Sequence, residues 1–365
     1  MPKVLHIMAN PQHGGVESYF AQLCVALQHA GQHQHVVLLE DESLRGILIR
    51  GGVSLTEIPR NAYNIQTLKA AINEALHSFQ PDIVQTWMHQ ATDSLPRGNY
   101  IHVGWLRGYQ NLEFFRHCDH LVGLTRGIVQ SIIEQGWPPE RIHHLRPFAR
   151  DEKASPVPRS QYTTPEHAPL LLALGVMHAY NAFDVALQAL AQLPDHYLWL
   201  VGSGEVEEEL HDFALQLGVD SRVRYLPWQD EKASLFAAAD TIVVPSRHEP
   251  FGLIPVEAWA LQKPLIISNA SAPRVAAGHE VDALLFPVDD VDALVRAVKR
   301  LNSDAALREK LIENGYKHFQ RDYTAELVVQ QYRHFYSDVL KKGKMRSPGL
   351  SRVEEWKDRI LAKFS

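Results

Sequence analysis

Two glutamates at a fixed spacing are the most informative feature of the chain. Glu249 and Glu257 are separated by seven residues, and Gly252 lies between them, after an apolar run with strand character and before one with helical spacing. A helix that begins at this turn directs unpaired N–H groups and the positive end of its dipole out of the carboxyl edge of the strand. A diphosphate can bind there, while the carboxylates accept hydrogen bonds from sugar hydroxyls. The pattern therefore predicts a sugar-nucleotide site.

Each residue of this site has an expected role. We expect the backbone N–H groups of Gly252, Leu253 and Ile254 to hold the diphosphate, Glu257 to hold the ribose hydroxyls, and Glu249 to hold the hydroxyls of the sugar. Replacing either glutamate by alanine is then expected to abolish or greatly reduce activity while the melting temperature stays nearly unchanged.

The elements that position this site alternate along the chain. Short apolar runs predict strands and amphipathic runs predict helices, in the order typical of repeated βαβ units. In the first half, the predicted strands are 4–9, 35–39, 82–86, 100–106, 120–124 and 142–145, and the predicted helices are 16–30, 65–79 and 128–135.

A stretch rich in proline, 147–169, interrupts this alternation, which then resumes. The predicted strands of the second half are 170–174, 198–201, 223–226, 241–244, 265–267 and 284–287, and the predicted helices are 183–193, 206–217, 233–239, a helix at the glutamate motif, 291–301, 305–319 and 325–340. Because 365 residues exceed what one hydrophobic core usually organises, we predict two doubly wound, Rossmann-like α/β domains.

The segment from Pro245 to Ala260 resembles a known family signature. It contains Glu-Pro-Phe-Gly-Leu and, three residues later, Glu-Ala, as in the retaining nucleotide-sugar glycosyltransferases of family 4, which have the GT-B fold. The resemblance implies two Rossmann-like domains facing a central cleft, and transfer with retained anomeric configuration, in which the departing phosphate acts as base. It divides the chain into an acceptor domain, a linker, a donor domain, and terminal helices that return to the first domain before a basic tail; the predicted bounds are 1–150, 151–168, 169–322 and 323–365.

Two pairs of glycines agree with this resemblance. Gly14 and Gly15 follow the first strand, where the family has a glycine-rich loop that approaches the donor from the amino-terminal domain. Gly202 and Gly204 follow strand 198–201, where the family has a second glycine turn, and we expect them to line the cleft. The alternative for each pair is that the glycines only permit a tight turn between strand and helix.

One segment departs from the family pattern. Val176 and Asn181 stand where the family has an arginine and a lysine that clamp the donor diphosphate. A hydrogen bond to a charged group contributes about 1.5–3 kcal/mol, so losing two weakens binding by roughly two orders of magnitude or more unless other cations substitute. The candidates are Arg107, Arg247 and Arg274. Arg107 is favoured and is predicted to be catalytic with Glu249, because it lies near the place where the family often has a histidine close to the sugar.

Two hypotheses about function remain open. The first is an active, metal-independent, hexosyltransferase-like enzyme that takes a sugar from a UDP or GDP donor to a glycan or lipid-linked acceptor in bacterial surface polysaccharide synthesis. It requires no cofactor besides the nucleotide sugar. The second is a non-catalytic GT-B-fold binding partner in a glycosylation complex, suggested by the missing clamp. A nucleotide-sugar epimerase is disfavoured by the signature, and an NAD-dependent dehydrogenase by the absence of Gly-x-Gly-x-x-Gly after the first strand.

The composition limits the classes of partner and the cellular location that we expect. The net charge of −6 argues against a nucleic-acid binder, because binding to phosphate backbones rests on clustered cations. Two cysteines cannot build a disulfide framework, and no apolar run reaches membrane-spanning length, so we expect a cytoplasmic protein.

The tail, 341–365, is basic and carries an apolar stripe at helical spacing: Val353, Trp356, Ile360, Leu361 and Phe364. This pattern predicts peripheral contact with the inner face of the cytoplasmic membrane. The alternative is that the stripe packs on the amino-terminal domain as a brace.

Overall fold

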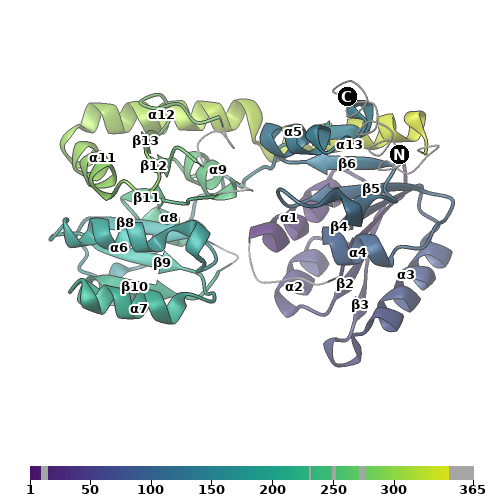
Figure 1. The fold of residues 1–365 in the computed structure, drawn as a ribbon, viewed down its shortest axis with the longest axis horizontal. Helices are drawn as coiled ribbons and strands as arrows, with labels where there is room; N and C mark the ends of the chain where they lie inside the picture. The colour runs from purple at the N-terminus through teal and green to yellow at the C-terminus, as the bar shows by residue number, and fades with distance from the viewer. Residues whose placement is uncertain (10–14, 230–231, 249–251, 271–275, 345–365) are drawn as a thin grey trace, which may run out of the picture. The chain divides into compact units, whose positions relative to one another are not determined.

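The computed structural model describes residues 1–9, 15–229, 232–248, 252–270 and 276–344 (Figure 1). It divides the chain into two units. The first contains Met1–Pro147 and the chain from Glu326 onward, and the second is Phe148–Ala325. The predicted linker, 151–168, belongs to the second unit and contains the 3₁₀ turn η4 (Arg159–Tyr162).

The described part of the first unit builds a seven-stranded parallel sheet in the order β3-β2-β1-β4-β5-β6-β7. Its strands are β1 (Val4–Met8), β2 (Gln34–Leu39), β3 (Leu55–Ile58), β4 (Ile83–Trp87), β5 (Ile101–Leu106), β6 (His120–Gly123) and β7 (Ile142–His144). Its helices are α1 (Gly15–His29), α2 (Glu42–Arg50), α3 (Ile65–Phe79), α4 (Met88–Ser94), α5 (Arg126–Glu134) and α13 (Ala325–Lys342), and its 3₁₀ turns are η1 (Arg60–Ala62), η2 (Leu112–Phe115) and η3 (Pro139–Arg141).

Side chains that alternate along the strands of this sheet pack into two separate cores, one on each face. Leu5 and Ile7 of β1 pack with Leu68 and Ile72 of α3 on one face. On the other face the Trp87 and Trp105 rings lie 4.4 Å apart at their centroids and form an aromatic layer. Tyr19 of α1 stacks on Trp105 with 6.3 Å between the ring centroids, so this layer joins the sheet to α1.

Helix α13 is fixed to this layer by polar groups as well as rings. The indole N–H of Trp105 donates to the Tyr332 hydroxyl at 3.3 Å, and the Tyr336 hydroxyl donates to Gln85 Oε1 at 3.0 Å. The last described helix therefore packs on the unit formed by the beginning of the chain.

The second unit has a six-stranded parallel sheet among its described residues, in the order β10-β9-β8-β11-β12-β13. The strands are β8 (Leu170–Leu174), β9 (Tyr197–Val201), β10 (Val223–Leu226), β11 (Thr241–Val244), β12 (Leu265–Ser268) and β13 (Leu284–Phe286). The helices are α6 (Phe183–Ala191), α7 (Glu207–Gln216), α8 (Ala233–Ala238), α9 (Leu253–Ala260), α11 (Val291–Ser303) and α12 (Ala305–Asp322), with turns η5 (Ala179–Asn181) and η6 (Asp220–Arg222).

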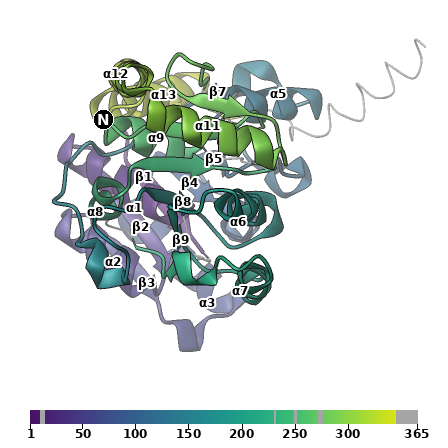
Figure 2. The same ribbon diagram turned by 90° about the vertical axis from the view of Figure 1, so that its left-hand side faces the viewer.

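Helices cover both faces of this sheet. Figure 2 shows α8 on one side of β8 and β9, and α6 and α7 on the other. The core shared with α6, α7 and α11 and the core shared with α8 and α9 are separate clusters on opposite faces. The prediction of two Rossmann-like α/β domains is thus confirmed. Across the described residues, we find no helix with both the length and the apolar character needed to cross a bilayer.

Candidate functional site

The strand order of the second unit fixes where a ligand should bind. β8 and β11 are neighbours in the sheet. The chain after β8 continues through α6 to β9 on one side, and the chain after β11 continues through α9 to β12 on the other side, so the loops that follow the two strands diverge at the carboxyl edge. Such a switch point is where ligands bind in open parallel α/β sheets. The loop after β8 contains Val176 and Asn181, and the loop after β11 leads to Gly252 and α9.

Helix α9 begins as the glutamate motif predicts. Gly252 is its N-cap with φ of 72°, a left-handed conformation that glycine adopts at little cost, and it has no side chain with which to cap the helix. Leu253 and Ile254 form the first turn. The positive end of the α9 dipole therefore lies at this edge of the sheet, and binding of a diphosphate there stays a prediction.

Glu257 lies on the second turn of α9 and is buried, with 8 % of its surface exposed. Its carboxylate is held by Lys232, whose Nζ lies 2.7 Å from Oε1 and 2.9 Å from Oε2. Sequence reasoning missed Lys232, because a single lysine in a loop carries no signal until the loop before α8 is placed against α9. Glu249 lies outside the described residues, so its predicted contact with the sugar stays a prediction.

The two residues that replace the clamp differ in their surroundings. Val176 is exposed, whereas Asn181 is buried and tied into the protein. The Asn181 amide donates to the Val176 carbonyl at 2.7 Å and accepts from the Ser246 hydroxyl at 3.3 Å. Asn181 thus fixes the loop after β8 to the end of β11.

Arg247, one of the candidate substitute cations, is engaged elsewhere. Its guanidinium makes two hydrogen bonds to Asp184, at 2.9 and 2.6 Å, and a third to Asp289 at 2.7 Å. The hydrogen bonds to Asp184, followed by the charges of both carboxylates, raise the pKa of Arg247. A cation paired in this way braces the loop and does not supply the missing positive charge. Arg274 lies outside the described residues.

The predicted cleft glycines have a packing role in the structure. A Cβ atom on Gly202 would lie 2.0 Å from the Gly175 carbonyl oxygen, and one on Gly204 would lie 2.3 Å from that of Met177. Met177 N–H also donates to the Ser203 carbonyl at 2.8 Å. These glycines let the loops after β8 and β9 interlock at the same sheet edge, and their contact with a donor stays a prediction.

The first unit contains the remaining predicted residues. Gly15 is the first residue of α1, and a Cβ there would meet no other atom within 4 Å. Gly14 is not among the described residues. Arg107 follows β5 and is half-buried, at the carboxyl edge of that sheet.

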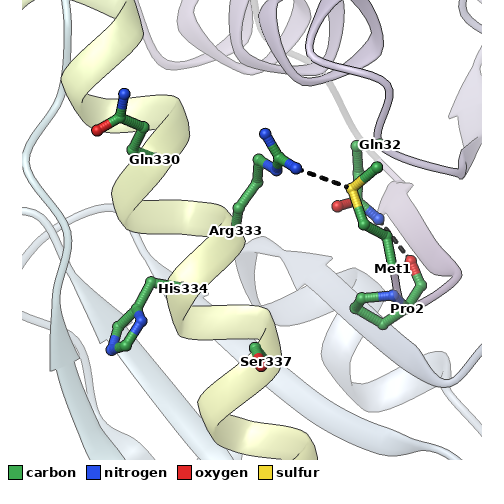
Figure 3. A pocket seen from close by; sticks show the side chains of 7 residues that line it. All are labelled: Met1, Pro2, Gln32, Gln330, Arg333, His334 and Ser337. Atoms are coloured by element: carbon green, nitrogen blue, oxygen red, sulfur yellow. Dashed lines mark hydrogen bonds between the residues drawn. The ribbon is translucent and has the colours of Figure 1, made fainter.

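A cavity of about 360 Å³ lies in the first unit at the opposite, amino-terminal edge of its sheet, beside β1 and α13 (Figure 3). Arg333 donates to the sulfur of Met1 across it at 3.3 Å. Its lining, which includes none of the predicted site residues, is Met1, Pro2, Gln32, Gln330, Arg333, His334 and Ser337.

Comparison with known proteins identifies a family model and relatives that match the chain. Residues 156–318, which include β8 to β13, match the family model described as glycosyl transferases group 1. The chain is 30% identical over 333 residues to the lipopolysaccharide core biosynthesis glycosyltransferase LpsD of Rhizobium meliloti, covering 90% of this chain and 96% of that protein. It is 29% identical over 325 residues to LpsE, of the same description and organism, covering 87% of this chain and 94% of LpsE.

A solved structure with the same fold is HepE of Anabaena in complex with UDP and glucose. Its TM-score with this chain is 0.79 at 18% identity, and the match covers 93% of this chain and 100% of HepE. Both the sequence match to LpsD and the fold match to HepE extend over nearly the whole of each protein.

Proposed function

The chain belongs to the glycosyltransferase group 1 family, and from this premise we propose that it is a retaining transferase that moves a sugar from a nucleoside diphosphate onto a glycan or glycolipid. We further propose that the acceptor is a growing lipopolysaccharide core. The observation that carries the proposal is the match to LpsD, which is named for lipopolysaccharide core biosynthesis and is covered almost end to end.

The donor end of the proposal is supported by α9. The diphosphate would lie at the N–H groups of Gly252, Leu253 and Ile254, where the helix dipole favours negative charge. Glu257 would accept hydrogen bonds from the ribose hydroxyls, and Glu249 from the hydroxyls of the sugar. The HepE complex with UDP and glucose supports a UDP sugar as the first donor to test.

In the proposed mechanism the protein orients the donor and stabilises the departing diphosphate. The bond between the anomeric carbon and the diphosphate oxygen breaks, the acceptor hydroxyl bonds to that carbon on the same face, and the departing phosphate takes the hydroxyl proton. Negative charge grows on the diphosphate as this bond breaks, so N–H groups fixed at the start of α9 bind the transition state better than the ground state. Closure over the donor would exclude water and limit hydrolysis.

The experiment is transfer with purified protein. UDP and GDP hexoses are supplied with truncated lipopolysaccharide cores, the products are identified by mass spectrometry, and the anomeric configuration is read by proton NMR. We expect one donor to give a product of the same configuration as the donor. Tight donor binding with an inverted product would overturn retention alone, whereas neither binding nor transfer with any donor would overturn the proposal.

Metal independence belongs to the same proposal, since the helix dipole and backbone N–H groups are proposed to balance the diphosphate charge. Activity in excess EDTA, after removal of adventitious metal, is expected to equal activity with added Mg²⁺ or Mn²⁺. Activity that disappears in EDTA and returns with either ion would contradict it.

A further inference from the structure

A buried ion pair lies beside the proposed donor site. The side chains of Lys232 and Glu257 are only 4% and 11% exposed, and the ammonium lies within 2.9 Å of both carboxylate oxygens. Charges removed from water are costly unless they are paired and well oriented. The burial of this ion pair therefore costs free energy, and a functional role for the pair would explain why it is kept.

The surroundings of Lys232 hold its ammonium in one place. Lys232 precedes α8 and follows β10, and its Nζ lies 4.8 Å from the centre of the Trp228 ring on the same loop. An indole face attracts a cation, most strongly where water is excluded. Contact with both the carboxylate and the indole restricts the lysine, and the carboxylate that it holds is restricted as well.

We propose that Lys232 is a positioning residue for the nucleotide, which acts by holding the Glu257 carboxylate in a single orientation. The inference rests on the proposed function, in which Glu257 receives the ribose. A carboxylate has about four acceptor positions, so one ammonium shared by both oxygens leaves one further position on each. Two adjacent hydroxyls of a ribose match such a pair of acceptors, whereas a 2′-deoxyribose offers only one hydroxyl.

Two other cations of the second unit, Arg247 and Lys263, do not have this role. Arg247 is engaged by Asp184 and Asp289. Lys263 donates to the carbonyls of Ala237 and Ala239, at 2.9 Å each, at the end of α8. Lys232 is the cation that contacts a predicted donor residue in the described part of the second unit.

The test uses the full-length protein and the substitution Lys232→Met. UDP, GDP, ADP and their 2′-deoxy analogues are titrated by calorimetry, and transfer kinetics are measured with the donor that wild type uses. Wild type is expected to prefer the ribose form by about tenfold or more, the effect of one or two hydrogen bonds. The variant is expected to lose most of this preference, and its donor KM to rise about tenfold while kcat changes less than about threefold.

Lys263→Met is the matched control, because it also removes a lysine that is anchored near α8, here half-buried, but leaves Glu257 untouched. We expect it to lower the melting temperature without changing the ribose preference or the donor KM. Where Lys232→Met does not fold, Lys232→Gln keeps a donor without the charge and is measured in its place.

A double variant distinguishes a role of Lys232 in positioning Glu257 from a role in the stability of the fold. If Lys232 acts through Glu257, adding Lys232→Met to Glu257→Gln should change the donor KM less than about twofold, and both single variants should resemble the double one. A Lys232 variant that folds and keeps the wild-type ribose preference overturns the inference and leaves the proposed function standing. Wild type that binds none of the six nucleotides overturns both.

Discussion

Asn181 stands where the family pattern has a lysine, and in the structure its side chain holds a loop in place by hydrogen bonds. Its amide both donates to the Val176 carbonyl and accepts from Ser246, which a lysine ammonium cannot do because it has no acceptor. The sequence predicted the loss of a cation at this position. It could not predict the gain of a loop contact, because the partners lie on segments far apart in the chain.

Glu257 shows how one contact revises a sequence-based expectation. Alanine at this position was expected to leave the melting temperature nearly unchanged, but Lys232 would then be a buried charge without its partner. Removing one member of a buried pair costs about 3–5 kcal/mol. We therefore predict that Glu257→Ala lowers the melting temperature by on the order of 10 °C, in addition to reducing transfer, as scanning calorimetry can measure.

Glu208→Ala is the control for that measurement, because Glu208 is exposed on α7. We expect it to melt within about 1 °C of wild type, since exposed substitutions usually change stability little. A Glu257→Ala protein that melts together with Glu208→Ala would show that the pair contributes no stability.

Two core histidines of the first unit predict how stability depends on pH. Burial lowers the pKa of His6 and of His102 to about 3. Because the unfolded chain takes up these protons near pH 6.5, stability is complete above that pH and is lost as the pH falls from 6.5 toward 3. At pH 5 each histidine is expected to cost about 2 kcal/mol relative to pH 8.

Urea unfolding followed by tryptophan fluorescence at pH 8 and pH 5 measures this loss. His6→Gln keeps an acceptor for the Trp87 indole, which donates to His6 Nδ1 at 3.3 Å, and removes the titrating ring. The variant should lose about 2 kcal/mol less than wild type on acidification. His33→Gln, at an exposed position, should follow wild type. Equal losses in all three proteins would contradict the assignment to His6.

At the scale of elements, buried parallel strands were the easiest to predict. β8 and β11 begin and end where their apolar runs do, because strands covered on both faces read as continuous hydrophobic segments. The missed elements have weaker patterns. α2 buries only Leu44 and Leu48, and β3 is a half-buried strand at the end of the sheet order, so neither shows a clear period.

The interlocked loops after β8 and β9 give a prediction at this scale. Gly202 has φ of 142°, and any Cβ there would overlap the Gly175 carbonyl. We predict that Gly202→Ala costs on the order of 3 kcal/mol or more, because it combines backbone strain with a clash that only loop movement can relieve. Thermal unfolding measures the loss.

Gly218→Ala provides the matched control. Gly218 also has positive φ, 66°, but a Cβ there would meet no atom within 4 Å. Its cost should be about 1–2 kcal/mol, from left-handed backbone alone. Donor affinity should fall with Gly202→Ala and stay unchanged with Gly218→Ala, since only the first displaces loops at the proposed site. Equal effects on stability and binding would mean that the loops do not depend on this close approach.

At the scale of the whole molecule, the net negative charge of the protein opposes the approach of an anionic ligand. The chain has a net charge of −6, yet its proposed donor carries a diphosphate and its proposed acceptor belongs to a membrane lipid. Long-range attraction cannot bring these ligands in, so positive potential must be concentrated in small regions. The start of α9 provides one such region for the donor.

The basic tail would provide a second region, for the acceptor side. Lys341 and Lys342 end α13, and the tail beyond residue 344 lies outside the described residues, so its membrane contact stays a prediction from sequence. Each basic residue near an anionic surface contributes about 1 kcal/mol, an attraction that salt screens. We predict that the full chain floats with anionic vesicles at low salt, is released at about 0.5 M salt, and does not bind neutral phosphatidylcholine vesicles.

Removal of residues 345–365 distinguishes this tail from a brace on the first unit. If the tail binds membrane, the shortened protein should stay in the unbound fraction while its melting temperature and its turnover of a soluble, detergent-free acceptor match those of the full chain. If the tail is a brace, the melting temperature should fall and flotation should not change, because the apolar stripe would then be covered by protein and unable to reach lipid.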